Sequence, residues 1–137
     1  MTRRLFLLLI TVLITTYSFA GGLLHYHTRS KDTTCKVVIR YGAARVLNSQ
    51  RITYTFTRIV RKKIVQQISG TAVLNKTADT ESYIDKDGLA IDAAEFQNDL
   101  KKYYISLKMP YDRGAKAIFI SIFNKKTDRE ETFILSR

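Results

Sequence analysis

The chain has 137 residues, which is enough for one small domain with a single hydrophobic core but not for two. It carries 23 lysines and arginines against 12 aspartates and glutamates, a formal net charge of +11. A lone cysteine, Cys35, excludes an internal disulfide, so stability must come from core packing. The sequence contains no Gly-rich phosphate loop, no G-x-S-x-G, no H-E-x-x-H and no C-x-x-C. We therefore expect a protein that is not an enzyme and that has neither a metal site nor a cofactor.

The most distinctive stretch is Leu5–Leu24, which has no charged residue. As a helix rising about 1.5 Å per residue, it reaches roughly 30 Å, the thickness of a bilayer core. Arg3 and Arg4 precede it, as expected for both an inside-facing membrane helix and a signal peptide. We predict a transmembrane helix that acts as a signal anchor, and the residues taken to represent its span are Leu5, Leu9, Leu13, Phe19 and Leu24.

A cleaved signal peptide is the alternative interpretation of the same stretch. Ser18-Phe19-Ala20 has the small-x-small form of a cleavage site before Gly21. The anchor is favoured because the apolar run continues through Leu24, which makes it long enough to span. Both interpretations export the rest of the chain. We predict a single-pass membrane protein, with a signal anchor at residues 1–24, a juxtamembrane linker at 25–34 and an exported domain at 35–137.

The basic charge is spread over the exported part of the chain. Residues 30–137 hold 20 lysines and arginines and 12 acidic residues, a net charge of +8. Export would place this domain away from nucleic acid, so we do not expect a nucleic-acid partner. Only Arg61–Lys63 forms a basic run, and it is short enough to be a hairpin turn. A solvated basic surface is the favoured interpretation, with attraction to anionic lipid headgroups or an acidic partner as the alternative.

Four strands are predicted in the first half of the domain, from β-branched enrichment and from alternation of apolar and polar residues. The clearest is Arg51–Arg58, where Ile52, Tyr54 and Phe56 alternate with threonines. Gly70 lies inside a later strand and suggests a bulge or a bend. The predicted strands cover Cys35–Tyr41, Arg51–Arg58, Lys63–Asn75 and Thr80–Asp85.

A helix is predicted over Asp92–Lys102, followed by three more strands. Asp92 can cap its first turn, Glu95 lies where a capping-box partner belongs, and two lysines end it. The fold class is therefore predicted as α+β: an N-terminal transmembrane helix, then a mainly antiparallel, curled β-sheet of about seven strands with one helix. The last three strands are predicted at Tyr103–Met109, Ala115–Phe123 and Glu131–Ser136.

Candidate interaction residues are the aromatic side chains and the thiol. Core packing is the favoured role of the aromatic residues, with a small apolar ligand or a partner face as the alternative. Cys35 begins an apolar strand and is expected to be buried, with an intermolecular disulfide as the alternative. The aromatic residues proposed for a partner or ligand face are Tyr54, Phe56, Tyr103, Tyr104 and Phe119.

The layout resembles that of FidL-like and ToxS-like small membrane proteins of Gram-negative bacteria. It shares a basic N-terminal dipeptide, an apolar span, a polar segment with His25 and His27, a cysteine opening the first strand at Thr34–Val38, and a late apolar strand at Ala117–Phe123. The resemblance implies a single-pass protein of the bacterial inner membrane whose α+β domain, residues 35–137, is periplasmic. It also implies a companion of a membrane-bound ToxR-type transcription regulator, which would bind and stabilise the regulator's periplasmic domain. The alternative function is a periplasmic or secreted binding module for a small apolar ligand, released by a signal peptidase.

Overall fold

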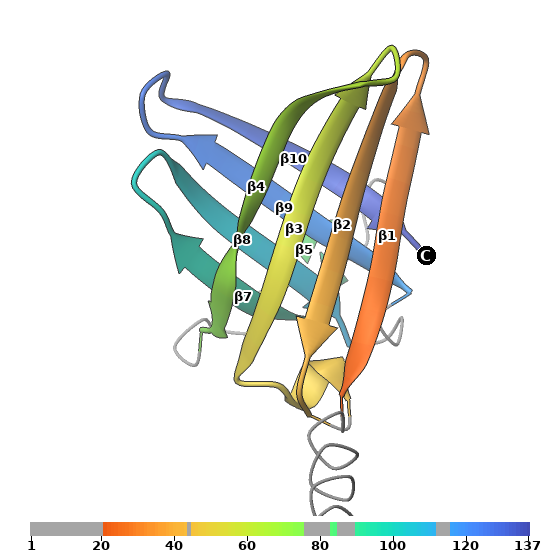
Figure 1. Cartoon of the computed structure of the whole chain (residues 1–137). Helices are drawn as coiled ribbons and strands as arrows, with labels where there is room; N and C mark the ends of the chain where they lie inside the picture. The colour runs from red at the N-terminus through yellow and green to blue at the C-terminus, as the bar shows by residue number, and fades with distance from the viewer. Residues whose placement is uncertain (1–20, 44, 76–82, 85–89, 112–115) are drawn as a thin grey trace, which may run out of the picture.

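The computed structural model describes residues 21–43, 45–75, 83–84, 90–111 and 116–137. Eight strands form a closed antiparallel barrel (Figure 1). Each barrel strand pairs with the next barrel strand along the chain, and the last strand pairs with the first. Two short strands, β5 (Tyr83–Ile84) and β6 (Ala90–Ile91), form a separate two-stranded sheet. The barrel strands are β1 (Gly22–Ser30), β2 (Thr33–Tyr41), β3 (Arg51–Val60), β4 (Lys63–Leu74), β7 (Ala93–Asp99), β8 (Tyr103–Pro110), β9 (Ala117–Asn124) and β10 (Arg129–Ser136).

The core lies inside the barrel and is filled by side chains from all eight strands. Alternation along β3 places Ile52, Tyr54 and Phe56 inside, as predicted, while the threonines between them face outward. An eight-stranded barrel has an interior just wide enough for side chains. The largest fully buried side chains are Tyr26, Phe56, Phe96, Ile39, Ile52, Ile105, Leu107, Met109, Ile118, Ile120, Leu135 and Val37.

The N-terminal organisation differs from the prediction. Leu5, Leu9, Leu13 and Phe19 lie outside the described residues, but Gly22–Leu24 belong to β1, and Leu24 is only 6% exposed in the barrel core. The predicted linker at residues 25–34 is also wrong, because it completes β1 and begins β2. Buried Leu24 and Tyr26 alternate with exposed His25 and His27, which is the pattern of a strand with one buried face. The apolar run before Leu24 had concealed this pattern.

No helix in the described part of the chain is long and apolar enough to cross a membrane. The strand assignment of Gly22–Leu24 contradicts the predicted transmembrane helix and signal anchor over Leu5–Leu24, because the end of that stretch pairs with β2 in the barrel. It also overturns the single-pass inner-membrane localisation, which was based on that helix.

The predicted helix over Asp92–Lys102 is wrong as well, and the α+β class is replaced by an all-β barrel among the described residues. Ala94 and Phe96 are buried at a spacing of two, and Phe96 lies opposite Leu107 of β8. Glu95 does not act in a capping box: it accepts hydrogen bonds from Ser106 Oγ (2.8 Å) and Gln97 Nε2 (3.0 Å) on the outer face. The sequence signals for a helix start and end were outweighed by the packing of side chains that alternate between the inside and the outside of the barrel.

Gly70 is regularly paired and does not mark the bulge that was predicted there. It lies opposite Tyr54, and the register instead shifts between Arg58 and Ile59. A Cβ at position 70 would overlap Asn98 Nδ2, which donates a 2.8 Å hydrogen bond to the Tyr54 hydroxyl. The missing side chain therefore makes room for a link between β3 and β7, close to where the backbone pairing of β4 with β7 ends.

Gly70→Ala is expected to lower the free energy of unfolding by about 1–3 kcal/mol, because the new Cβ displaces the Asn98 amide from Tyr54. Gly42→Ala is the control, since a Cβ there meets no atom within 4 Å. Urea unfolding followed by circular dichroism measures both variants. A Gly70→Ala protein as stable as the control would contradict this account.

The stability of the barrel should also depend on pH through Tyr26, which is fully buried. Burial raises the pKa of Tyr26 to about 12, against about 10 in the unfolded chain. The folded state thus favours the protonated phenol, so the contribution of Tyr26 to stability is fully present below pH 10 and falls by about 2 kcal/mol as the pH rises to 12. Urea unfolding across this range should show a shallower fall for Tyr26→Phe, and an identical fall in both proteins would refute the assignment.

Candidate functional site

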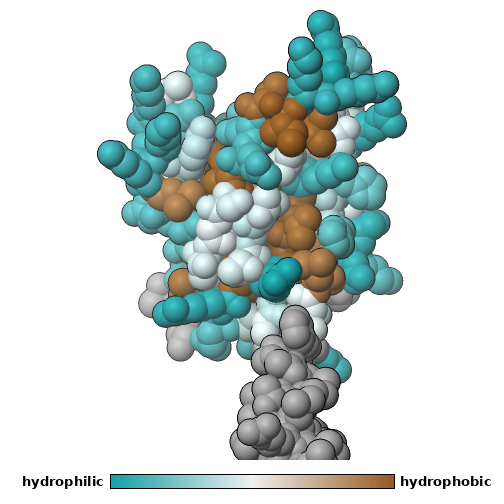
Figure 2. Space-filling model, viewed as in Figure 1, coloured by the Kyte–Doolittle hydropathy of each residue, from teal (hydrophilic) through white to brown (hydrophobic). Residues whose placement is uncertain are grey.

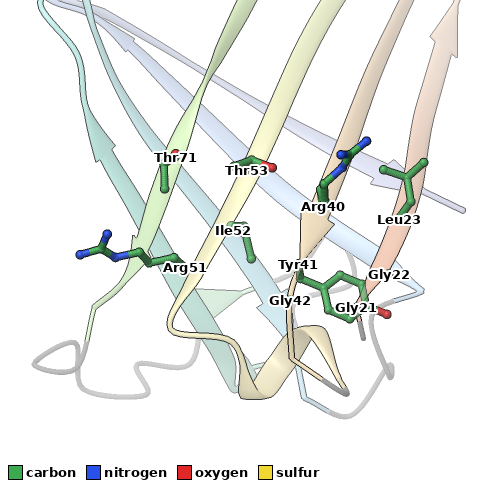
Figure 3. A pocket seen from close by; sticks show the side chains of 10 residues that line it. All are labelled: Gly21, Gly22, Leu23, Arg40, Tyr41, Gly42, Arg51, Ile52, Thr53 and Thr71. Carbon is green, nitrogen blue, oxygen red and sulfur yellow. The ribbon is translucent and has the colours of Figure 1, made fainter. Parts of the chain in front are cut away.

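A groove of about 480 Å³ crosses the outer face of β1–β4 (Figure 3). Its walls include a cross-strand row in which Leu23 lies opposite Arg40, Arg40 opposite Thr53, and Thr53 opposite Thr71. All four side chains face outward, because they alternate with the buried positions of their strands. The remaining lining residues are Gly21, Gly22, Tyr41, Gly42, Arg51 and Ile52.

Glycines at one end of the groove let β1 and β2 pack closely together. Gly22 lies opposite Tyr41, and a Cβ on Gly22 would overlap the Tyr41 ring; a Cβ on Gly21 would overlap the Tyr41 carbonyl oxygen. A tyrosine packed over a glycine on the neighbouring strand restores packing that the glycine lacks. The start of β1 therefore approaches the end of β2 more closely than any residue with a side chain would allow.

Two exposed arginines, Arg40 and Arg51, give the groove its charge. None of the ten lining residues is acidic, and within the described residues no ion pair joins either arginine to a carboxylate. Guanidinium groups remain charged at every physiological pH and present a planar fork of donors that matches carboxylates and phosphates. Leu23 and the backbone around the glycines add apolar and polar surface beside them. This combination of cationic donors and apolar surface suits an anion with an apolar part.

The surrounding surface has the same sign of charge. Residues 21–75 contain ten lysines and arginines but a single acidic residue, Asp32. Because β1–β4 are neighbours in the barrel, most of these charges share one side of the molecule, whereas Arg58 packs against Phe133 and pairs with Glu131 of β10. The sequence reasoning missed Arg40, Arg51, Thr53 and Thr71, because it treated the basic residues as scattered. Counting the net charge of residues 21–75 separately from that of the rest of the chain would have indicated this basic face.

A second polar cluster lies near the opposite end of the barrel. Arg58 pairs with Glu131 of β10 at 2.8 Å, and its guanidinium lies 5.0 Å from the centre of the Phe133 ring. That ring in turn packs against Phe56, with 5.4 Å between ring centres. Arg58 is thus committed to holding β3 and β10 together. The cluster acts as a structural link across the barrel and leaves the arginine's charge matched.

Cys35 is 2% exposed and faces the barrel interior, as its place in an apolar strand predicted. Burial raises the pKa of the Cys35 thiol, and the neighbouring Arg58 guanidinium offsets this only in part. A protonated, enclosed thiol is a poor nucleophile. The alternative of an intermolecular disulfide at Cys35 therefore disagrees with its burial in the folded barrel.

The five aromatic residues proposed for a partner or ligand face do not form one face. Tyr54 and Phe56 are buried inside the barrel, where Tyr103 is half-buried; Tyr104 and Phe119 face outward, although Phe119 is only 7% exposed. Burial raises the pKa of Tyr54. Burial also raises the pKa of Tyr104, and the negative charges of nearby Glu95 and Asp99 raise it further. The interior members are packing residues, which agrees with the favoured interpretation of the aromatic set.

No metal site can be assembled from the described residues, where no three His, Cys, Asp or Glu side chains gather as ligands. Comparison with known proteins adds no family: no family model matches the chain, and no similar curated protein or solved structure was found. The argument for function therefore depends on the groove and on the charge of the β1–β4 face.

A thiol reagent is expected to label Cys35 at least about 100-fold more slowly in the folded protein than in the urea-unfolded chain, because the sulfur is enclosed and protonated. The rate is measured with an Ellman-type reagent in buffer and in urea. Fast, stoichiometric labelling of the folded protein would show that the thiol is accessible and would revive the intermolecular disulfide.

Proposed function

We propose that this protein is a binding module whose outer groove takes an acidic, partly apolar segment of a partner protein. The observation that carries the proposal is the groove itself, which has exposed Arg40 beside Leu23, exposed Arg51 at its other side and no acidic lining residue (Figure 3). Arginines bind carboxylates in a bidentate geometry, which gives orientation as well as attraction. Both arginines and Leu23 come from strands of a rigid barrel, so the site is arranged before the partner arrives.

The size of the groove suits a short extended segment. Four neighbouring strands about 4.8 Å apart give a row roughly 14 Å long. An extended chain rises about 3.3 Å per residue, so this row accommodates about four or five residues. The barrel interior is less suited to a small apolar ligand, since large side chains from all eight strands already fill it. The proposal therefore places the ligand outside the barrel.

The positive β1–β4 face supports this function at longer range. A surface that is rich in lysine and arginine and whose strands and turns carry a single acidic residue, Asp32, attracts an acidic partner before contact and raises the rate of encounter. Such attraction weakens with added salt, because exposed charges are screened over about 10 Å at 0.1 M.

Export by cleavage after Ala20 is part of the proposal. All eight barrel strands follow the Ser18-Phe19-Ala20 motif, and β1 starts at Gly22. Cleavage there would place a new α-amino group on Gly21, which lines the groove, and so add a third cation to it. The resemblance to FidL-like and ToxS-like companions suggests a ToxR-type regulator as the partner, and this identity stays a prediction.

Arg40→Glu/Arg51→Glu is expected to weaken binding of a labelled peptide of alternating Glu and Leu by at least about 10-fold, because two attractive charges become repulsive. The affinity is measured by fluorescence anisotropy at low salt. Lys101→Glu/Lys102→Glu makes the same change in net charge on the exposed β7–β8 turn and should bind nearly as the wild type does.

A peptide of alternating Lys and Leu serves as the ligand control and should not bind. Equal losses in the two double variants would mean that net charge alone drives the binding. That result would refute the groove as the site.

A further inference from the structure

The hairpin that joins β3 to β4 ends in an exposed tip that combines aliphatic and basic side chains. Ile64 and Val65 are 62% and 57% exposed, and the turn between the strands is Arg61-Lys62. We call this region the β3–β4 tip, and it comprises Ile59, Val60, Arg61, Lys62, Lys63, Ile64 and Val65. It lies at the end of the barrel opposite the groove (Figure 1).

The exposure of two consecutive aliphatic residues comes from the β-bulge. Arg58 pairs with Gln66 and Ile59 pairs with Ile64, so Val65 is an extra residue on β4. In a regular strand, one of two consecutive side chains points into the barrel. The extra residue breaks this alternation. Both Ile64 and Val65 therefore face solvent.

The turn residues are unusual for their backbone conformation. Arg61 and Lys62 both have positive φ, 49° and 65°, as in the tight two-residue hairpins that favour Asn and Gly. Long basic side chains are disfavoured there, and strain kept in a native structure clusters at functional positions. The sequence thus retains two cations at the apex where the backbone would prefer other residues.

The neighbouring β1–β2 turn extends the charge of the tip. Arg29 near the end of β1 and Lys31 in the turn are both exposed, while the Asp32 carboxylate lies 3.6 Å from Arg61 Nε. Five cations thus surround the aliphatic group against one acid. Figure 2 shows this pattern, an apolar cluster at the top of the barrel between strongly hydrophilic projections.

We propose that the β3–β4 tip docks the barrel on an anionic phospholipid surface. Aliphatic side chains enter the boundary between headgroups and acyl chains, and lysines and arginines around them pair with lipid phosphates. A bilayer suits this tip better than a protein does. The tip is convex and carries only four aliphatic side chains, whereas a standard protein interface uses about 20–30 residues on each side.

Docking by this tip sets the orientation of the groove. Seven residues separate Thr53 of the groove from Val60 of the tip along β3, which corresponds to roughly 23 Å. A barrel seated by its tip would therefore hold the groove clear of the lipid and open to a partner. This orientation is separate from the proposed function, because vesicle binding and peptide binding use opposite ends of the same strands.

Single-tryptophan reporters in the full chain test the proposal, since the natural sequence has no Trp. Val65→Trp is expected to shift its emission to shorter wavelength on vesicles of phosphatidylcholine and phosphatidylglycerol, but not on phosphatidylcholine alone. Ile134→Trp on the outer face of β10 is the matched control, because that position is exposed but lies away from the tip. Equal shifts at both positions, or none at Val65→Trp, would overturn the proposal.

Charge variants give a second, independent measurement. Lys62→Gln/Lys63→Gln is expected to reduce partitioning onto the anionic vesicles by about 25-fold, roughly fivefold for each surface cation lost. Lys101→Gln/Lys102→Gln, in the exposed turn between β7 and β8, is the control, because it removes the same net charge at a place away from the tip. Equal partitioning of the two variants would overturn the proposal, and would point to a protein rather than a lipid surface as the occupant of the tip.

Discussion

Closure of the barrel is the constraint on which the rest of this structure depends. At one seam His27 of β1 pairs with Ser136 of β10, and at the other two residue pairs join β4 to β7. Long ladders hold β1–β4 together and β7–β10 together, but these seams are short. The two halves are therefore held together chiefly by the side chains that fill the interior, with added links from Arg58 to Glu131 and from Asn98 to Tyr54.

This dependence explains which parts of the fold the sequence could predict. β3, β8, β9 and β10 were predicted as strands because each alternates or is rich in β-branched residues along its own length. β1 was missed because Leu24 continues an apolar run, and β7 was missed because Asp92 and Glu95 imitate the start of a helix. In both cases the decisive fact is a partner strand far along the chain, and no local pattern contains it.

The groove was harder to predict than the barrel, for the same reason. Leu23, Arg40, Thr53 and Thr71 are brought into one row by the registers of three separate strand pairs. A register error of one residue would place each of them inside the barrel. What the sequence does contain is a difference in charge: a single acid in residues 21–75, against seven acids in residues 90–137. That difference locates a basic half of the barrel without locating the groove.

The different roles of inward and outward side chains explain how half of the barrel can be so basic. Inward positions on β1–β4 are committed to packing, which leaves outward positions free to carry charge without a cost to the core. In the other half, Glu131 and Asp99 pair with Arg58 and Lys125, so its charges are partly used to join strands. The β1–β4 face has almost no acid to offset its cations, and self-repulsion of this kind opposes folding. Binding of an anionic partner would relieve that repulsion, so the barrel should gain stability whenever its basic face is occupied.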